Sequence, residues 1–346
     1  MRGEQYRKPV EEGFPEILNI GGVVFEKRSG LRYGWNPGQP AAFYREINAQ
    51  GPCLGNMEVL QENSDKKLGY INLEDAGVGL RMITKLHSVY ATEKVVSVIK
   101  HCNPSGVAKA NTLMKAFSLA WNCNSLSAFG GVVCLSDTVD ESMAKLLASK
   151  EYFIEVIVAP GYSDKARELL SVKKDLRLIK VGELNKIDDV PIEYKRVPGG
   201  LLVQQRYETR IISRDKLEVV SLRAPTEFEF EASIFNWIVC GFVRSNSIVI
   251  GDKNQTIGIG SGQQSRIDSF RLAAWYANNR SKLGCKGKVA ASDAFFPASD
   301  CIEMAAEEGI TAIVYTLGSI KDKEVIGRAN EKNIAMLVTN ERCFTH

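Results

Sequence analysis

Ser97-Val98-Ile99-Lys100-His101-Cys102-Asn103-Pro104-Ser105-Gly106 is the stretch around which the predicted fold is arranged. The apolar run from Val95 to Ile99 predicts a buried strand, and the turn formers from Asn103 to Gly106 should end it. Lys100 and His101 are therefore expected at the carboxyl end of a strand, where α/β sheets place their chemistry. A fixed cation beside a group that titrates near neutrality suits polar group transfer, although a surface Lys-His pair that merely ends a strand would give the same pattern.

Length and composition predict a globular protein of one large or two ordinary domains. The chain has 346 residues, of which 45% are hydrophobic and 25% charged. Its formal net charge of +3 is too small to indicate a nucleic-acid partner. No apolar run approaches the roughly 18 residues of a membrane span, and Met1 to Lys8 contains no apolar signal core. We therefore expect a cytoplasmic protein that binds neither nucleic acid nor membranes.

The eight cysteines predict reduced thiols rather than a metal centre. No two of them are spaced as CxxC, so a structural zinc site is not expected, and most lie in apolar surroundings. Cys102 follows His101 and could serve as a nucleophile. The Asn-Pro pair after it favours a residue in a turn over a presented thiolate.

The chain also repeats one order of elements. Val133–Asp137 reads V-C-L-S-D and Val289–Asp293 reads V-A-A-S-D, and each is followed by a predicted helix and then by a strand, Glu155–Ala159 or Ala312–Thr316. A glycine turn, a helix and a further strand come next in both copies. The order predicts two tandem copies of one α/β unit that join near Pro191–Gly200, although two unrelated βαβ stretches could share it by coincidence.

The second copy has candidate elements of its own. The strand that ends at Lys100-His101 should be matched by the apolar run that ends at Arg244–Ser247, and a helix ahead of this run should begin with a capping box from Thr226 to Glu229. Residues 258–266, G-I-G-S-G-Q-Q-S-R, predict a strand, a glycine-rich turn and a helix start. Backbone amides in such a turn attract anions, so the segment is a weak candidate for a phosphate cradle.

Residues 292–300, S-D-A-F-F-P-A-S-D, place two adjacent aromatic residues between two acids. One interpretation is an aromatic staple under a loop. The other is a flat apolar slot with a carboxylate at its mouth, which would suit a planar nitrogen heterocycle. The strand predicted from Ile334 to Val338 indicates that the chain end, with Arg342 and His346, is anchored.

These stretches together resemble the transformylase part of the bifunctional purine biosynthesis proteins, the AICAR (5-aminoimidazole-4-carboxamide ribonucleotide) formyltransferases. The resemblance runs from Leu31 to His346 and rests on these motifs in combination: LRYGxNP, KHxNPxG, SAFGG, RSNSI, GxGSGQQSR, SDAFFPxxD and a closing Arg…His. It implies an α/β fold of two tandem cytidine-deaminase-like domains, residues 1–192 with the N-terminal arm and residues 193–346. The zinc-binding HxE and CxxC motifs of such deaminases are absent from the sequence, so no zinc is expected. The resemblance also implies a homodimer with shared active sites, and it allows a structural monovalent cation such as potassium.

Matching positions carry the roles that the resemblance implies. His101 would accept a proton, Lys100 would stabilise the transition state, and Asn246 would hold the substrate and its developing charge. The positions that match nucleotide-binding residues are Arg32, Tyr33, Gly130, Glu155, Phe295, Arg342 and His346. Those that match folate-binding residues are Arg266, Pro297, Asp300, Ser319 and Ile320.

The implied activity is formyl transfer from 10-formyltetrahydrofolate to the 5-amino group of AICAR, which gives formyl-AICAR and tetrahydrofolate in de novo purine (IMP) biosynthesis. Two alternatives stay open: a relative that uses another formyl donor, such as a modified pterin or formate with ATP, and a nucleotide-binding relative without activity. The sequence has no Walker-type ATP loop. Lys100, His101 and Asn246, which an inactive relative should have lost, are all present.

The sequence departs from the family pattern at a few places. Bifunctional members carry an IMP cyclohydrolase domain ahead of the transformylase, whereas only 30 residues precede Leu31. Cyclohydrolase activity is therefore not expected, and a separate cyclohydrolase protein would be a partner. Gly38 stands where the family usually has His, and Ala298-Ser299 stand where Phe-Arg is common, which could alter the folate side. Glu155 stands where some members have Asp.

Overall fold

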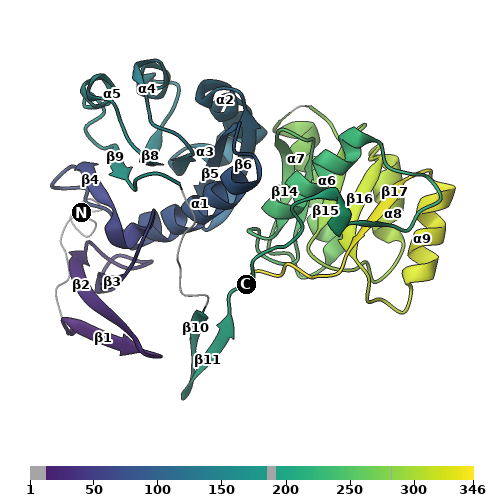
Figure 1. Ribbon diagram of the computed structural model, residues 1–346, viewed down its shortest axis with the longest axis horizontal. Coiled ribbons are helices and arrows are strands. Elements are labelled where there is room, and N and C mark those ends of the chain that lie inside the picture. Colours follow the sequence, from purple (N-terminus) through teal and green to yellow (C-terminus); the bar gives the residue numbers. More distant parts are fainter. Residues whose placement is uncertain (1–12, 185–191, 282) are drawn as a thin grey trace. The chain divides into compact units, whose positions relative to one another are not determined.

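The computed structural model describes residues 13–184, 192–281 and 283–346. They divide into two compact units, one within residues 1–187 and the other within residues 188–346 (Figure 1). The amino-terminal stretch Met1–Lys8 and Pro191, at the predicted join, lie outside the described residues. Among the residues that are described, no helix is both long and apolar enough to cross a membrane.

The first unit is built on a mixed six-stranded sheet in the order β4-β9-β8-β7-β5-β6. Strands β7, β8 and β9 run parallel to one another, whereas β4, β5 and β6 each pair antiparallel with their neighbours. The bounds are β4 Glu58–Gln61, β5 Lys94–Lys100, β6 Asn103–Ala110, β7 Gly131–Leu135, β8 Ile154–Ala159 and β9 Arg177–Lys180.

Helices cover both faces of this sheet. Alternate side chains of a strand point to opposite faces, so Val96 and Val98 enter one apolar core with α2, α4 and α5, while Ser97 and Ile99 face α1. The helices are α1 Tyr70–Val89, α2 Leu113–Cys123, α3 Ser125–Ala128, α4 Glu141–Ala148 and α5 Asp164–Leu170. A separate three-stranded antiparallel sheet precedes them, formed by β1 Ile17–Ile20, β2 Val23–Leu31 and β3 Ala41–Glu46, and is followed by the short helix η1 Leu54–Asn56.

The second unit repeats this architecture with the sheet order β12-β17-β16-β15-β13-β14. Helix α6 takes the place of α1, and α7, α8 and α9 share the apolar core on the other face. The strands are β12 Glu218–Val219, β13 Ile248–Gly251, β14 Thr256–Gly260, β15 Val289–Ser292, β16 Ala312–Thr316 and β17 Ala335–Thr339. The helices are η2 Arg214–Lys216, α6 Glu227–Cys240, α7 Arg266–Asn279, α8 Asp300–Glu307 and α9 Asp322–Glu331, and a hairpin of β10 Ile192–Val197 and β11 Gly200–Gln205 comes first.

Strand order and strand direction are the same in both units, which is compatible with the predicted duplication. In each sheet three parallel strands are flanked on one side by one antiparallel strand and on the other by an antiparallel pair. One predicted correspondence is wrong: β5 is matched by β13, and Arg244–Ser247 precede that strand instead of ending it. The apolar run ahead of them belongs to α6, which is buried on nearly all sides and so lacks a polar face. Its predicted capping box is confirmed, because Thr226 Oγ1 accepts from Glu229 N and Glu229 Oε2 accepts from Thr226 N.

The turn after Lys100 comes two residues earlier than predicted. Lys100 pairs directly with Asn103, so His101 and Cys102 form a two-residue hairpin turn with φ of 54° and 58°. Two-residue turns of type I′ require positive φ at both positions and usually contain Asn-Gly, so His-Cys gave no turn signal. The left-handed conformation costs about 1–2 kcal/mol for each residue with a side chain.

The segment that follows the turn is also corrected. Asn103–Ala110 form the edge strand β6, where proline is tolerated because one side of the strand makes no ladder hydrogen bonds. The next helix, α2, begins at Leu113, where the Thr112 side chain caps it by accepting from Lys115 N.

Matching glycines let one helix approach the edge of each sheet. A Cβ on Gly106 of β6 would lie 2.0 Å from the carbonyl oxygen of Ala120 in α2, and one on Gly258 of β14 would lie 2.0 Å from that of Ala273 in α7. This close approach gives Gly258 a packing role within the segment that suggested a phosphate cradle.

Gly258→Ala should therefore lower the free energy of unfolding by more than ~2 kcal/mol, because the added methyl group meets backbone that cannot move aside. The matched control is Gly327→Ala in α9, where the added Cβ meets nothing within 4 Å and should stabilise the helix by up to about 1 kcal/mol. Thermal unfolding followed by circular dichroism measures both variants. A Gly258→Ala protein as stable as Gly327→Ala would contradict the packing argument.

Candidate active site

Lys100 and Gly130, both named by the resemblance, lie close together in the first unit. Lys100 Nζ donates a 2.6 Å hydrogen bond to the carbonyl oxygen of Phe129. Gly130 follows with φ of 72°, and its N–H donates to the carbonyl oxygen of Phe153 at 2.7 Å. A Cβ at Gly130 would lie 3.8 Å from Lys100 Nζ, so the missing side chain keeps the space beside the ammonium open.

His101 projects from the hairpin turn and is exposed. The turn is held from below by Asp75 of α1, whose Oδ1 accepts from Cys102 N at 2.6 Å and whose Oδ2 accepts from His101 N at 3.3 Å. Asp75 is 4% exposed. The sequence analysis missed Asp75. The usable signal is its position four, seven and eleven residues before Gly79, Met82 and Leu86, which places an acid on the buried face of the helix.

Arg32 and Tyr33 follow β2 and contact one another. Arg32 Nη2 donates to the Tyr33 hydroxyl at 2.7 Å, and the guanidinium lies 4.6 Å from the centre of the Tyr33 ring. The buried Arg32 Nε has no hydrogen-bond partner among the described residues. An unpaired buried donor costs about 1–3 kcal/mol, so this atom is a candidate to bind a ligand oxygen.

Glu155, another predicted residue, sits at the start of β8 between two partners that the sequence analysis did not single out. Asn72 Nδ2 donates to Glu155 Oε2 at 2.9 Å, and Arg177 Nη1 lies 3.7 Å from the same oxygen. Burial lowers the pKa of Arg177, Glu155 opposes this effect, and the charge of Arg32 adds to it. Because Arg32 and Arg177 repel each other, an anionic group bound near them would be stabilised.

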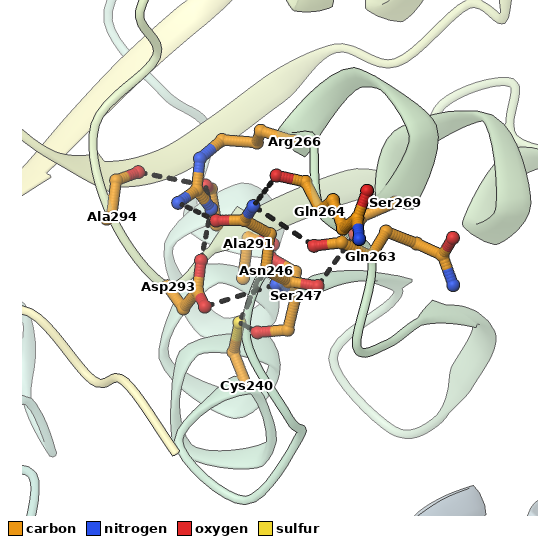
Figure 2. Close-up of polar contacts among 11 residues, drawn as sticks. Cys240, Asn246, Ser247, Gln263, Gln264, Arg266, Ser269, Ala291, Asp293 and Ala294 are labelled. Carbon is orange, nitrogen blue, oxygen red and sulfur yellow. Dashed lines mark hydrogen bonds and ion pairs between the residues drawn. The ribbon is translucent and has the colours of Figure 1, made fainter. Parts of the chain in front are cut away.

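In the second unit, Asn246 and Arg266 belong to one buried network (Figure 2). Arg266 is 7% exposed, and its guanidinium donates to Asn246 Oδ1 and to Ser292 Oγ, both at 2.9 Å, and forms an ion pair with Asp293. The Ser269 hydroxyl donates to the carbonyl oxygen of Asn246 at 2.6 Å. The resemblance assigns Asn246 and Arg266 to different substrates, and a hydrogen bond connects their side chains directly.

The side-chain amide of Asn246 donates both of its hydrogens to backbone carbonyl groups. Its Nδ2 donates to the carbonyl oxygens of Gln263 and Gln264 at 3.1 and 3.0 Å (Figure 2). Its Oδ1 accepts one bond from Arg266 and has a second lone pair. In this arrangement the side chain can accept a hydrogen bond from a ligand more readily than donate one.

Asp293 does not form the carboxylate at the mouth of the slot that the sequence suggested. Asp293 is fully buried, accepts from Ser247 N at 3.1 Å and pairs with Arg266, so its charge is used inside the protein. Phe296 is also fully buried and stacks on Tyr315 with 5.3 Å between ring centres. Phe295, in contrast, is partly accessible and lies beside Gly318, where an added Cβ would lie 3.3 Å from the Phe295 ring.

The other predicted residues of this unit lie on loops and at helix starts. Asp300 is exposed at the first position of α8 and accepts from Cys301 N, and Pro297 and Ile320 are exposed. Ser319 N donates to Asp322 Oδ2 at 3.1 Å, which fixes the loop that carries Ile320.

The chain end is anchored, as predicted, and it lies beside Asn246. Ser245 N donates to the carbonyl oxygen of Thr345 at 2.8 Å, and Cys343 N donates to that of Asp293 at 3.1 Å. Arg342 and His346 are both exposed and both lie near the Phe344 ring, with the Arg342 guanidinium 5.3 Å and the His346 ring centre 5.9 Å from its centre.

The two units carry their candidate residues at opposite edges of their sheets. In the first unit, Lys100 ends β5 while Gly130 and Glu155 lie where the parallel strands β7 and β8 begin. In the second unit, Asp293 and Ser319 follow the parallel strands β15 and β16 at their carboxyl ends. The rule that places chemistry at carboxyl ends therefore describes the parallel strands of the second unit only.

Among the described residues, no group of three or more His, Cys, Asp or Glu side chains is arranged to hold a metal ion.

Arg266→Lys keeps the positive charge but cannot serve the three partners that the guanidinium bridges, so one buried polar group loses its bond. We expect a loss of about 1–3 kcal/mol in the free energy of unfolding. The control is Arg271→Lys on the same helix, whose exposed pair with Asp268 at 2.8 Å should be worth less than ~1 kcal/mol. Equal thermal unfolding midpoints for the two variants would argue against the bridging role.

Sequence comparison shows that the chain is similar to known proteins over nearly its whole length. Residues 4–276 match the family described as AICARFT/IMPCHase bienzyme. The bifunctional purine biosynthesis protein PurH of Sorangium cellulosum (strain So ce56) is 41% identical over 335 residues, and that of Acetivibrio thermocellus is 38% identical over 337 residues. Each alignment covers 97% of this chain and, respectively, 61% and 62% of the relative, so the chain spans about three fifths of their length.

A structural comparison adds little. A solved structure from Desulfotalea psychrophila, assigned as a formate dehydrogenase accessory protein, covers 50% of this chain and 96% of its own at 10% identity. Its TM-score of 0.24 is too low to indicate a shared fold.

Proposed function

Because the chain belongs to the AICARFT/IMPCHase bienzyme family, we propose that it transfers a formyl group from 10-formyltetrahydrofolate to the 5-amino group of AICAR. The products are formyl-AICAR and tetrahydrofolate, in de novo purine biosynthesis. The observation that carries the proposal is the alignment of 97% of this chain with proteins named for purine biosynthesis. The presence of Lys100, His101 and Asn246 supports it.

Lys100 is the proposed donor to the oxyanion. The amine of AICAR is a poor nucleophile because its lone pair is delocalised into the imidazole carboxamide, so attack on the formyl carbon needs a stabilised tetrahedral intermediate. An ammonium has three N–H groups, and Lys100 uses one on the Phe129 carbonyl, which fixes its direction and leaves two for substrate. One well-placed donor of this kind is worth ~3 kcal/mol of transition-state stabilisation.

His101 is the proposed base. As the nitrogen–carbon bond forms, the amine loses a proton to the neutral imidazole, directly or through the carboxamide. Collapse of the intermediate then breaks the bond to the folate nitrogen, which must gain a proton as it leaves, and Lys100 is the proposed donor. The exposure of His101 on a turn supports a role toward substrate.

Asn246 is proposed to orient the substrate as an acceptor. Its two amide hydrogens bond to backbone, so the remaining lone pair of Oδ1 is suited to an N–H of the attacking amine. This revises the expectation that Asn246 donates to the oxyanion.

Two arginines are proposed to bind the phosphate of the nucleotide. Arg32, with its unpaired Nε, and Arg342, which is exposed, suit phosphate. The further nucleotide-binding residues are proposed to be Tyr33, Gly130, Glu155, Phe295 and His346. The folate is assigned to Pro297, Asp300, Ser319 and Ile320, with Arg266 acting through the Asn246 network.

Further parts of the proposal follow from the family resemblance. Each unit is proposed to be a cytidine-deaminase-like domain, divided at residues 192 and 193 and without zinc, and the protein to be a cytoplasmic homodimer with shared active sites. A separate IMP cyclohydrolase is the proposed partner in the pathway. No step depends on the structural monovalent cation, such as potassium, that the resemblance allows.

The experiment that tests the function is a formyl-transfer assay on purified protein with AICAR and 10-formyltetrahydrofolate. Parallel reactions contain formate with ATP, or a modified formyl-pterin, as the donor. Product formation with the folate alone is expected. Formation of formyl-AICAR with formate and ATP as the donor would contradict the proposal. So would the absence of product with every donor.

Two substitutions should separate proton transfer from binding. His101→Ala should lower kcat by about 10²- to 10⁴-fold with little change in AICAR affinity, because the imidazole acts on a proton. Arg342→Ala should raise KM for AICAR more than it lowers kcat, because a phosphate contact is made in ground and transition states alike. Steady-state kinetics and AICAR binding by calorimetry give both values. Equal losses of affinity and rate in His101→Ala would count against the base.

A further inference from the structure

The turn that carries His101 is held in a conformation that its residues disfavour. His101 and Cys102 both have positive φ, at 54° and 58°, where glycine and asparagine are the usual residues. Such conformations persist only where the surrounding structure fixes them, and His101 is exposed, so its own packing does not. The turn therefore needs support from another element.

Asp75 gives this support from inside α1. Each of its two carboxylate oxygens accepts from one of the two turn amides, Oδ1 from Cys102 N at 2.6 Å and Oδ2 from His101 N at 3.3 Å. The side chain is 4% exposed, on a helix whose Gly79 packs closely against Cys134 and Ile99 of the sheet. An asparagine in its place would offer one oxygen and would turn an N–H group toward the other amide.

We propose that Asp75 is a positioning residue, which fixes the His101 imidazole for proton transfer by holding both amides of the turn. The inference rests on the proposed function, because it assumes that His101 acts on the substrate.

The charge state of Asp75 distinguishes positioning from a purely structural role. The titratable groups that face it are His101 and Cys102 of the turn and Cys134 of β7. Tyr70, five residues earlier on α1, faces Cys102. Burial raises the pKa of Asp75, although the Cys102 and His101 amides oppose the shift. Burial, with the Asp75 charge adding to it, also raises the pKa of the Cys134 thiol.

A raised carboxyl pKa means that the ionised form destabilises the folded state. This destabilisation is fully present above the folded-state pKa and disappears as the pH falls through it toward the ordinary value. As the pH falls, the wild-type protein should therefore gain stability relative to a variant with a neutral side chain at position 75.

The first test compares Asp75→Asn with the matched control Asp140→Asn. Asp140 caps α4 by accepting from Met143 N at 2.8 Å, so the chemical change is the same at a place far from the turn in sequence and on another helix. Asp75→Asn should lower kcat at least tenfold and leave KM for AICAR within threefold, and its unfolding temperature should fall relative to that of wild type as the pH is lowered from neutral. Asp140→Asn should keep kcat within twofold. A kcat within threefold of wild type for Asp75→Asn would overturn the proposal.

The second test restores the turn by another route. Glycine adopts φ near 58° without help, so adding Cys102→Gly to Asp75→Asn should raise kcat at least threefold over the single variant. Cys102→Gly alone should stay within threefold of wild type. A double variant no faster than Asp75→Asn would show that Asp75 does not act through the turn.

Amide hydrogen exchange measures how well Asp75 holds the turn, and it does not depend on an activity assay. The N–H groups of His101 and Cys102 should exchange at least tenfold faster in Asp75→Asn than in wild type, and unchanged exchange would overturn the proposal. If the wild type does not formylate AICAR, the proposed function fails, and the exchange result decides separately whether Asp75 holds the turn.

Discussion

The antiparallel pairing of β5 with β7 decides where the chemistry of the first unit lies. Because the two strands run in opposite directions, the end of β5 at Lys100 meets the place where β7 begins, after Gly130. The ammonium can then reach the carbonyl of Phe129. A parallel β5 would carry Lys100 to the other edge of the sheet, about five residues of strand, or roughly 16 Å, away. The hairpin turn, the glycine and the lysine form one local arrangement because of this single strand direction.

Each unit then uses one buried acid to hold its most important loop. In the first unit Asp75 accepts from two amides of a strained turn. In the second unit Asp293 accepts from Ser247 N, next to Asn246, and pairs with Arg266. The difference is the counter-charge: Asp293 has a guanidinium, whereas burial raises the pKa of Asp75 with only amides, the His101 imidazole and the Cys102 thiol to oppose it. Asp293 is paired with a buried cation, whereas Asp75 is held at the expense of stability.

The sequence predicted those features that depend on local pattern. Apolar runs located β8, β16 and β17, and the spacing from Thr226 to Glu229 located the start of α6. It failed where tertiary contacts overrode local preference. His-Cys is no turn signature, and α6 is buried on nearly every side, so it shows no clear helical period. Motif matches identified Lys100, Gly130, Asn246 and Arg266 as candidate site residues. They did not identify the residues that hold the candidate residues in place. Asp75, Asn72 and Arg177 act across tens of residues of sequence, and no spacing rule connects them to the groups they hold.

The duplicated motif shows why repetition of the fold does not repeat the site. V-C-L-S-D and V-A-A-S-D end in Asp137 and Asp293, at equivalent places after β7 and β15. Asp293 is fully buried and organises Arg266, whereas the Asp137 side chain is 43% exposed and pairs with Lys94 at 2.5 Å, an interaction worth at most about 1 kcal/mol. The reverse holds at the other edge, where the hairpin that corresponds to His101-Cys102 contains Asp252, which accepts from Asn254 N and Gln255 N and pairs with Lys288. Each copy therefore keeps at one edge the polar residues that the candidate site needs, and at the other edge uses the equivalent positions for ordinary loop stability.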